Sequence, residues 1–319
     1  MKFSKKYLEK VIVLFLLSTL YGMFVYYFVS SWSFDYDAVV STVSYFQNEN
    51  YNYANILAFN SFTTFFFTKL LVGHNAEFIV SLFYGICAAL RFFVYGLLLR
   101  WMWFIPVFTS MIVMLDFNTS RYSLAVTVFI FFFGVWRRNH FKNIGVIKVG
   151  VLTVMFIHLH HFAVAFAALF SKTSYLFRTL IIGLVPITVA AMSDTFSRFL
   201  NLKDPEGFPR IAIIYLMFTL FLIVNTKIKK SEFKVLYSII VLLGAFQLMG
   251  VQFSNVYYAR FFFLAFDVTL IMIALNTRAV RVTACGILVN ERYLRVLGIC
   301  IVSALYQFIL INGNIWRFF

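Results

Sequence analysis

Apolar runs long enough to cross a membrane recur along the whole chain. Of its 319 residues, 62% are hydrophobic and only 12% are charged. About 20 consecutive apolar residues are needed to cross roughly 30 Å of hydrocarbon. The chain repeats runs near that length, whereas a membrane barrel would show short alternating segments. The sequence therefore predicts an all-α, polytopic integral membrane protein in which residues 1–319 form one domain.

Basic residues gather in the short turns between the apolar runs. The formal net charge is +15, and an excess of Lys and Arg marks cytoplasmic loops. The N-terminal lysines therefore predict a cytoplasmic N-terminus, and the basic turns are expected to meet anionic lipid and not nucleic acid. The three cysteines lack ligand-like spacing, so neither a zinc site nor a disulfide framework is predicted.

This charge rule predicts about eleven spans and an external C-terminus. Residues 54–72 carry many polar side chains, so this segment is expected to form an interfacial or re-entrant helix on the external face. Arg91 falls inside a span and is expected to snorkel toward the cytoplasm. The expected spans are residues 11–30, 77–99, 101–115, 121–136, 144–158, 160–171, 180–193, 211–226, 235–251, 261–276 and 296–312.

On this topology, polar side chains from distant segments share the external face. Arginine matches phosphate oxygens bidentately and stays charged, and a histidine or carboxylate can take a proton from an incoming hydroxyl. An external polar site at membrane depth is therefore predicted, with simple interfacial anchoring as the alternative for any single residue. Its expected members are Asp35, Asp37, Asp116, Arg121, His158, His160, His161, Arg210 and Arg260.

The segment from Ser31 to Tyr53 adds acidic and aromatic side chains to that face. Its only charges are Asp35, Asp37 and Glu49, and Tyr36 is one of many aromatic residues beside them. Aromatic rings stack on the CH faces of sugars, and carboxylates accept hydrogen bonds from sugar hydroxyls. The segment is therefore typical of a glycan-binding surface, with an interfacial aromatic belt as the alternative.

Several of these pieces occur in an order that is characteristic of one enzyme family. They are Asp35 with Asp37, Asn118-Thr-Ser-Arg121-Tyr122 before Leu124-Ala125, the basic turn 137–142, His160-His161-Phe-Ala163, and Tyr258-Ala-Arg260. Together they resemble the EpsG-like family of bacterial surface-polysaccharide polymerases, which is akin to the Wzy O-antigen polymerases. The resemblance covers about residues 32–170 and, more loosely, the chain as far as Phe263.

The resemblance implies a glycosyltransferase-C-like fold in the bacterial inner membrane. It also implies a reaction on the external, periplasmic face. A polyprenyl-diphosphate-linked glycan is transferred onto another lipid-linked repeat unit, and polyprenyl diphosphate is released. The expected partners are this lipid-linked oligosaccharide, membrane lipid and a chain-length regulator. No cofactor, metal ion or nucleic acid is expected.

Residue roles follow from the same resemblance. Arg121 and Arg260 are expected to bind the diphosphates, with Arg210 as a third cation. His160 is the first choice for the catalytic base, followed by Asp37 or Asp35. The residues expected to contact the glycan are Asn118, Tyr122, Tyr36 and His161.

The chain departs from the family pattern at three points. Tyr122 stands where the family commonly has Gln, His161 stands where it often has Ser, and an acidic residue common before the interfacial helix is absent. These departures affect the expected substrate contacts and leave Arg121 and His160 in place.

Two other functions are compatible with the sequence. A lipid-linked oligosaccharide flippase or another transporter would also be a basic helical membrane protein, although such proteins often show internal repeats and paired broken helices. Neither feature is clear here. A membrane O-acyltransferase that modifies the same glycan is the other alternative, and it would need an acyl donor.

Overall fold

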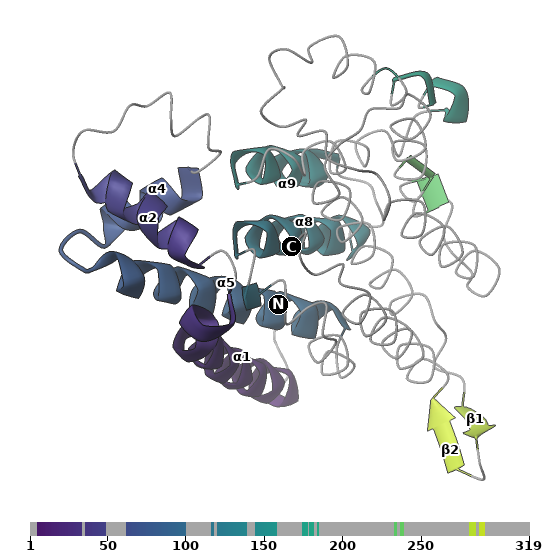
Figure 1. Ribbon diagram of the computed structural model, residues 1–319. Helices are drawn as coiled ribbons and strands as arrows, with labels where there is room; N and C mark the ends of the chain where they lie inside the picture. The colour runs from purple at the N-terminus through teal and green to yellow at the C-terminus, as the bar shows by residue number, and fades with distance from the viewer. Residues whose placement is uncertain are drawn as a thin grey trace, which may run out of the picture.

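The described part of the chain is mainly helical (Figure 1). A computed structural model describes residues 5–33, 36–48, 62–99, 116–117, 120–138, 144–157, 174–177, 179–181, 184, 233–234, 237–238, 281–284 and 287–290. Its elements are α1 (Lys5–Trp32), α2 (Tyr36–Gln47), α4 (Phe62–Leu70), α5 (Ala76–Leu99), α8 (Ser120–Arg138), α9 (Ile144–Ile157), β1 (Arg281–Ala284) and β2 (Ile287–Asn290).

Two of the described helices are long and apolar enough to cross a membrane. They are α1, over Tyr7–Trp32, and α5, over Ala76–Leu98, and they match the first two predicted spans. Helix α9 contains a shorter apolar stretch, Gly145–Val154. Of the predicted spans that begin at or beyond residue 160, and of the one at 101–115, the structure describes only residues 180, 181, 184, 237 and 238. The total of about eleven spans therefore stays a prediction.

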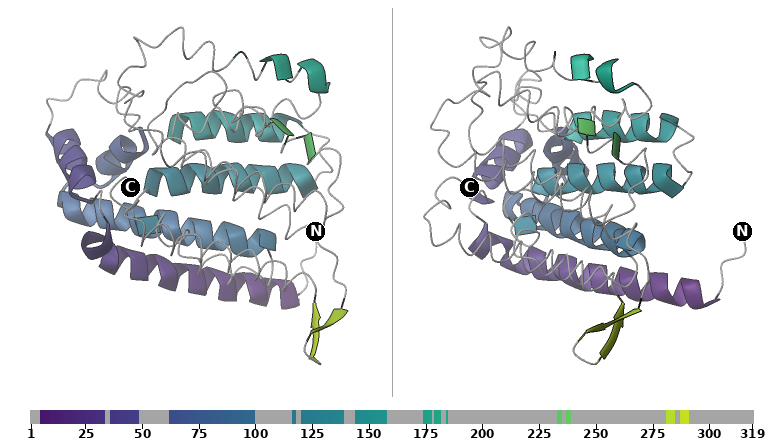
Figure 2. Two further views of the ribbon diagram at one scale, coloured as in Figure 1. Left: turned by 45° about the vertical axis from the view of Figure 1, so that its right-hand side comes forward. Right: turned by 90° about the vertical axis from the view of Figure 1, so that its right-hand side faces the viewer.

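Four helices lie side by side in the order α1, α5, α8 and α9 (Figure 2). Helix α1 is at one edge, and most of its apolar length is exposed, whereas most of α5 is buried between neighbours. The exposed side chains of α1 include Leu16, Leu20, Met23 and Tyr27. An apolar face of this kind is what a helix presents to lipid, because hydrocarbon does not penalise exposed apolar side chains as water does.

Small residues let α1 and α5 cross with their backbones in contact. A Cβ atom built on Gly22 would lie 2.6 Å from the carbonyl oxygen of Gly85 and 2.8 Å from the Cβ of Ala89. Gly85 and Ala89 are four residues apart, which is the spacing of small residues at close helix crossings in membranes. The contact between the two helices therefore depends on the absence of side chains here.

Helix α8 lies between α5 and α9. A Cβ atom on Gly134 would contact the side chain of Leu98 in α5, and one on Gly150 of α9 would lie 2.6 Å from the Cβ of Phe132 in α8. Only residues 139–143 connect α8 to α9, and such a short connection joins antiparallel neighbours. This pair matches two predicted spans and the basic turn between them.

Helices α2 and α4 pack at the N-terminal end of α5. The prediction of an interfacial helix over residues 54–72 corresponds to the shorter α4, which contacts α2, α5 and α9. Helix α2 was not expected, because residues 31–53 were interpreted as a polar segment. Its buried residues Tyr36, Val43 and Phe46 recur at intervals of seven and three, so they share one helical face.

A side-chain hydrogen bond caps the start of α5. Asn75 caps α5, since its Oδ1 accepts a hydrogen bond from the Phe78 amide at 2.8 Å.

Strands β1 and β2 form an antiparallel hairpin in which Arg281 pairs with Asn290 and Ala284 with Ile287. This hairpin lies in the predicted last cytoplasmic loop, where no strand was expected. Cys87 is buried, and Cys285 and Cys300 lie outside the described residues.

Candidate functional site

A buried carboxylate joins three helices near the centre of the described bundle. Asp116 is 1% exposed and Arg91 is 2% exposed, and the guanidinium Nη2 of Arg91 donates to Oδ2 of Asp116. The same Oδ2 accepts a hydrogen bond from the Tyr21 hydroxyl at 2.8 Å. Oδ1 accepts one from Ser123 Oγ at 2.9 Å. Side chains from α1, α5 and α8 therefore converge on one carboxylate.

This polar cluster lies well inside α1 and α5, whereas Ser123, its member from α8, is the fourth residue of that helix. Arg91 is fifteen residues after the start of α5 and eight before its end, about 22 Å and about 12 Å along its axis at 1.5 Å per residue. Tyr21 is eleven residues before the end of α1, about 16 Å from that end. The structure thus corrects one expectation: Arg91 is buried and paired with Asp116 and does not snorkel to an interface. Asp116, an expected member of the external polar site, is buried beside it.

The sequence contained one usable signal for this cluster. An ionisable side chain inside an apolar segment is costly, so it usually pairs with another such group. Arg91 is the sole charged residue between Glu77 and Arg100, and Asp116 is the sole acidic residue between Glu77 and Asp194. Their opposite charges could have suggested a pair, but the sequence does not say which helices bring them together.

Arg121 lies in the first turn of α8 and is half-buried. At 100° per residue, its side chain leaves α8 about 200° from that of Ser123, which faces the cluster. It is only about 20° from the direction of Phe132, the residue that packs against Gly150 of α9. Arg121 therefore lies on the side of α8 that faces α9, at the end predicted to be external.

The C-terminal end of α9 lies toward the same end of this helix pair. Arg121 precedes the contact residue Phe132 by eleven positions, and Ile157 follows the contact residue Gly150 by seven. Because α8 and α9 are antiparallel, going back from Phe132 to Arg121 and forward from Gly150 to Ile157 leads to the same end of the pair. The distances are about 16 Å along α8 and about 10 Å along α9. The chain continues from Ile157 into His158, His160 and His161, which lie outside the described residues.

Asp37 and Tyr36 occupy the first turn of α2. Asp37 is exposed, and an acidic side chain here also complements the positive end of the helix dipole. Tyr36 is 8% exposed. Its hydroxyl donates to the carbonyl oxygen of Glu77 at 3.2 Å and lies 2.9 Å from Ser81 Oγ. Burial, the largest cause, raises the pKa of Tyr36, so the phenol stays protonated at physiological pH.

These contacts argue against the sugar-stacking role predicted for Tyr36. A ring that packs between α2 and α5 has little surface left for a glycan, and its hydroxyl is already hydrogen-bonded. The helical periodicity of residues 36–46 was the signal that could have indicated this burial. Tyr36 is therefore better explained as a contact that fixes α2 on α5.

The remaining predicted site residues are not placed by the structure. For Tyr122 the structure gives only its position in α8 and not its side chain. Within the described residues, no three His, Cys, Asp or Glu side chains gather as metal ligands would, and metal independence stays a prediction. The predicted residues outside the described part are Asp35, Asn118, His160, His161, Arg210 and Arg260.

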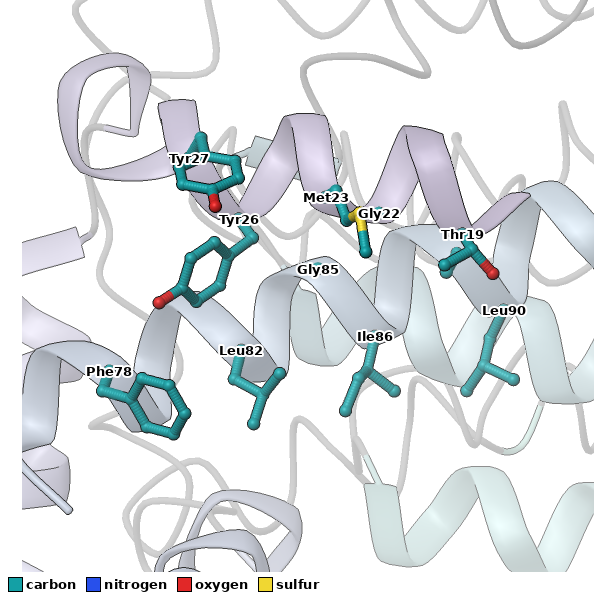
Figure 3. Close-up of a pocket in the computed structure, with 11 residues that line it drawn as sticks. Thr19, Gly22, Met23, Tyr26, Tyr27, Phe78, Leu82, Gly85, Ile86 and Leu90 are labelled. Carbon is teal, nitrogen blue, oxygen red and sulfur yellow. The ribbon is translucent and has the colours of Figure 1, made fainter. Parts of the chain in front are cut away.

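An apolar groove of about 470 Å³ lies between α1 and α5 (Figure 3). Gly22 and Gly85 lie at its centre, and Tyr26, Leu82 and Ile86 are among its lining residues. On α5, Leu82 and Ile86 point about 140° to 180° away from Arg91, at 100° per residue. The groove and the polar cluster are therefore on different faces of α5, and the groove is not part of the candidate site.

No protein-family model matches the chain, and neither a curated protein nor a solved structure matches it.

Proposed function

We propose that the chain is a polysaccharide polymerase of the bacterial inner membrane. It crosses the membrane about eleven times in a glycosyltransferase-C-like, all-α fold, with its N-terminus in the cytoplasm and its C-terminus outside. It transfers a polyprenyl-diphosphate-linked glycan onto another lipid-linked repeat unit at the external face. The sequence motifs that resemble the EpsG-like polymerases are the source of this proposal.

The observation that carries the proposal is the packing of α8 against α9. Arg121 lies on the α9 side of α8, and α9 ends at Ile157, three residues before His160. The proposed phosphate-binding cation is thus at the end of the helix pair from which the chain continues toward the candidate base in the sequence. This arrangement agrees with the predicted external site, in which Arg121 and His160 act on the same pair of substrates.

Two further features support a membrane enzyme. The exposed apolar face of α1 suits contact with lipid. The buried pair of Arg91 and Asp116 suits an environment in which charges must be paired, because water is not there to solvate them.

The proposed reaction exchanges one bond for another at the anomeric carbon of the donor glycan. A hydroxyl oxygen of the acceptor glycan attacks that carbon, and the bond from the carbon to the diphosphate oxygen breaks. Polyprenyl diphosphate leaves with the bonding electron pair. His160, or failing it Asp37 or Asp35, takes the hydroxyl proton, a contribution of about 10²–10⁴ in rate.

Cations have the larger task in this mechanism. The leaving diphosphate gains negative charge in the transition state, and preorganised cations in a site of low dielectric stabilise that charge. We assign this role to Arg121 and Arg260, with Arg210 as a third cation. Asn118, Tyr122 and His161 are proposed to contact the glycan, whereas Tyr36 is omitted because it is buried. The proposed partners are the lipid-linked oligosaccharide, membrane lipid and a chain-length regulator.

The test is complementation in the native host after deletion of the gene. Wild type, Arg121→Ala and His160→Ala are expressed, their membrane levels are matched by immunoblot, and the surface polysaccharide is separated on a gel. Arg137→Ala is the matched control, because Arg137 is also a half-buried arginine of α8 but is sixteen residues, about 24 Å, from Arg121.

The proposal expects a ladder from wild type and Arg137→Ala, and a single repeat unit on the carrier from the deletion, Arg121→Ala and His160→Ala. Lipid-linked units that accumulate on the cytoplasmic side in the deletion would indicate a flippase instead. A polymer of normal length that lacks a substituent would indicate an O-acyltransferase.

A further inference from the structure

We propose that Asp116, held by Arg91, is a positioning residue that sets the rotation and depth of α8 and thereby directs Arg121 toward the lipid-linked substrate. The functional part of this inference rests on the proposed polymerase activity. The geometric part, that the Asp116 contacts determine where Arg121 lies, does not.

Asp116 is fixed from three directions. Oδ2 accepts hydrogen bonds from Arg91 on α5 and from Tyr21 on α1, while Oδ1 accepts one from Ser123 on α8. Both oxygens are thus engaged, and the carboxylate is almost fully buried. Hydrogen bonds to a charged group are roughly twice as strong as neutral ones. Ser123 is therefore held at one point relative to α1 and α5.

The contact of Ser123 with Asp116 also sets the rotation of α8 about its axis. Ser123 and Gly134 are eleven residues apart, about 20° in direction, and both meet the α5 side: Ser123 through Asp116 and Gly134 through Leu98. Arg121 and Phe132 are also eleven residues apart, so they share the opposite side of α8, where Phe132 contacts α9. Fixing Ser123 toward Asp116 consequently keeps Arg121 on the side of α9.

Helix α8 begins deeper in the bundle than α5. Two contacts join α8 to α5: Gly134 lies beside Leu98, and Ser123 binds the same carboxylate as Arg91. The later residue of α8 meets the later residue of α5, so the two helices run in the same direction. Counting thirteen residues back from Gly134 and from Leu98 places Arg121 level with Gly85. That level is nine residues, about 13 Å, below the start of α5. Arg121 is thus recessed relative to the outer end of α5, and the cluster lies deeper still.

A charged cluster is suited to this task because its geometry is discrete. Apolar residues of similar volume often stabilise a protein as much as a buried ion pair does, or more. However, an apolar contact tolerates rotation, whereas a hydrogen-bonded carboxylate accepts its donors only in a narrow range of directions. The cluster therefore adds a defined orientation of α8 to the packing that already holds the helices together.

The test measures the position of residue 121 directly, without requiring catalysis. Arg121→Cys is introduced into a chain whose three native cysteines are replaced by alanine or serine. Labelling by a membrane-impermeant maleimide is then timed in intact spheroplasts, with and without Ser123→Ala or Asp116→Asn. Ser123→Ala is the primary variant, because it deletes the hydrogen bond to α8 and leaves the ion pair of Arg91 and Asp116 intact. Arg137→Cys, labelled after permeabilisation, is the control position in α8.

We expect Ser123→Ala and Asp116→Asn to change the labelling rate at residue 121 several-fold and to leave the rate at residue 137 unchanged. Asp116→Glu, which keeps the charge and the acceptor oxygens, is expected to restore part of the wild-type rate. An unchanged rate at residue 121 in Ser123→Ala would overturn the positioning role. So would equal changes at residues 121 and 137, because these would indicate general loosening of the helix.

The same substitutions are then made in chains that retain Arg121 and are tested for the polysaccharide ladder. A changed labelling rate together with shortened ladders supports both proposals. If labelling changes but the wild-type chain itself does not restore a ladder to the deletion strain, the polymerase proposal fails and the positioning role stands. If wild type restores the ladder but labelling does not change, the positioning role fails alone.

Discussion

Gly22 and Gly85 place the backbones of α1 and α5 in direct contact. A Cβ atom on either residue would lie 2.6 or 2.7 Å from the carbonyl oxygen of the other. A carbonyl oxygen belongs to the helix backbone and cannot move without displacing its own hydrogen bond. A methyl group at this crossing therefore has to separate the two helices.

The first prediction compares glycines that differ in what their added methyl group would meet. Gly22→Ala is expected to destabilise the protein by about 1–3 kcal/mol, as overpacking typically does. Gly96→Ala is expected to cost less, because the three atoms nearest to its methyl all belong to the flexible side chain of Leu14. Thermal unfolding midpoints of the two variants in detergent would test this. Equal midpoints would show that the crossing of α1 and α5 is not tight.

The second prediction concerns the buried ion pair. Asp116→Asn leaves the Arg91 guanidinium buried without its countercharge, and removing one partner of such a pair typically costs about 3–5 kcal/mol. The double variant Arg91→Met with Asp116→Leu is expected to recover much of that loss, because apolar residues of similar volume often replace buried pairs well. The thermal midpoint of the purified protein is the measurement. A wild-type midpoint for Asp116→Asn would contradict the observed pairing.

The third prediction separates packing from substrate binding at Tyr36. Tyr36→Phe removes the hydroxyl that contacts Glu77 and Ser81 and is expected to cost about 1–2 kcal/mol of stability. It should leave a normal polysaccharide ladder at equal membrane level. A full-length, abundant protein that makes no polymer would restore the glycan-binding role that the sequence suggested.

The raised pKa of Tyr36 also fixes the sign of its pH dependence. A group whose pKa is higher in the folded state contributes stability below its unfolded pKa, which is about 10 for tyrosine, and loses it as the pH rises through the folded value. The stability difference between wild type and Tyr36→Phe should therefore be constant from about pH 6 to 9. A difference that shrinks within this window would contradict the burial of the phenol.

The fourth prediction concerns the start of α5. Asn75→Ala removes the side-chain acceptor for the Phe78 amide and is expected to cost about 0.5–2 kcal/mol. Asn75→Asp is the matched control, because it retains an acceptor oxygen and adds a charge that suits the helix N-terminus. The thermal unfolding midpoint of Asn75→Asp should stay near that of wild type, and the midpoint of Asn75→Ala should be lower. An equal loss of stability in both variants would show that the side-chain acceptor at residue 75 does not stabilise α5.

Much of the helix layout could be predicted from the sequence because it depends on local pattern. The runs at residues 11–30 and 77–99 predicted α1 and α5, and the turn around Arg137 predicted that α8 and α9 would be antiparallel. These features follow from the length of an apolar run and from the shortness of a connection, and both are properties of consecutive residues.

The polar cluster could not be derived in this way, because it depends on contacts between distant residues. Tyr21 and Asp116 are 95 positions apart. The offset by which α8 begins deeper than α5 depends on how Gly134 meets Leu98, and no local pattern encodes it. The burial of Tyr36, in contrast, depends on local pattern. The acidic and aromatic residues around it suggested a glycan-binding surface, whereas its spacing from Val43 and Phe46 places it on a buried helical face.

The separation of the clustered residues along the chain also determines the order in which they can meet during synthesis. Arg91 is translated 25 positions before Asp116, an interval of roughly one to five seconds at about 5–20 residues per second. Tyr21 is made earlier still. A nascent α5 therefore carries its arginine without the countercharge for seconds, and α1 cannot form the hydrogen bond from Tyr21 until Asp116, which precedes α8, has left the ribosome. The contacts that join α1, α5 and α8 at Asp116 are consequently complete only after Ser123 has followed it.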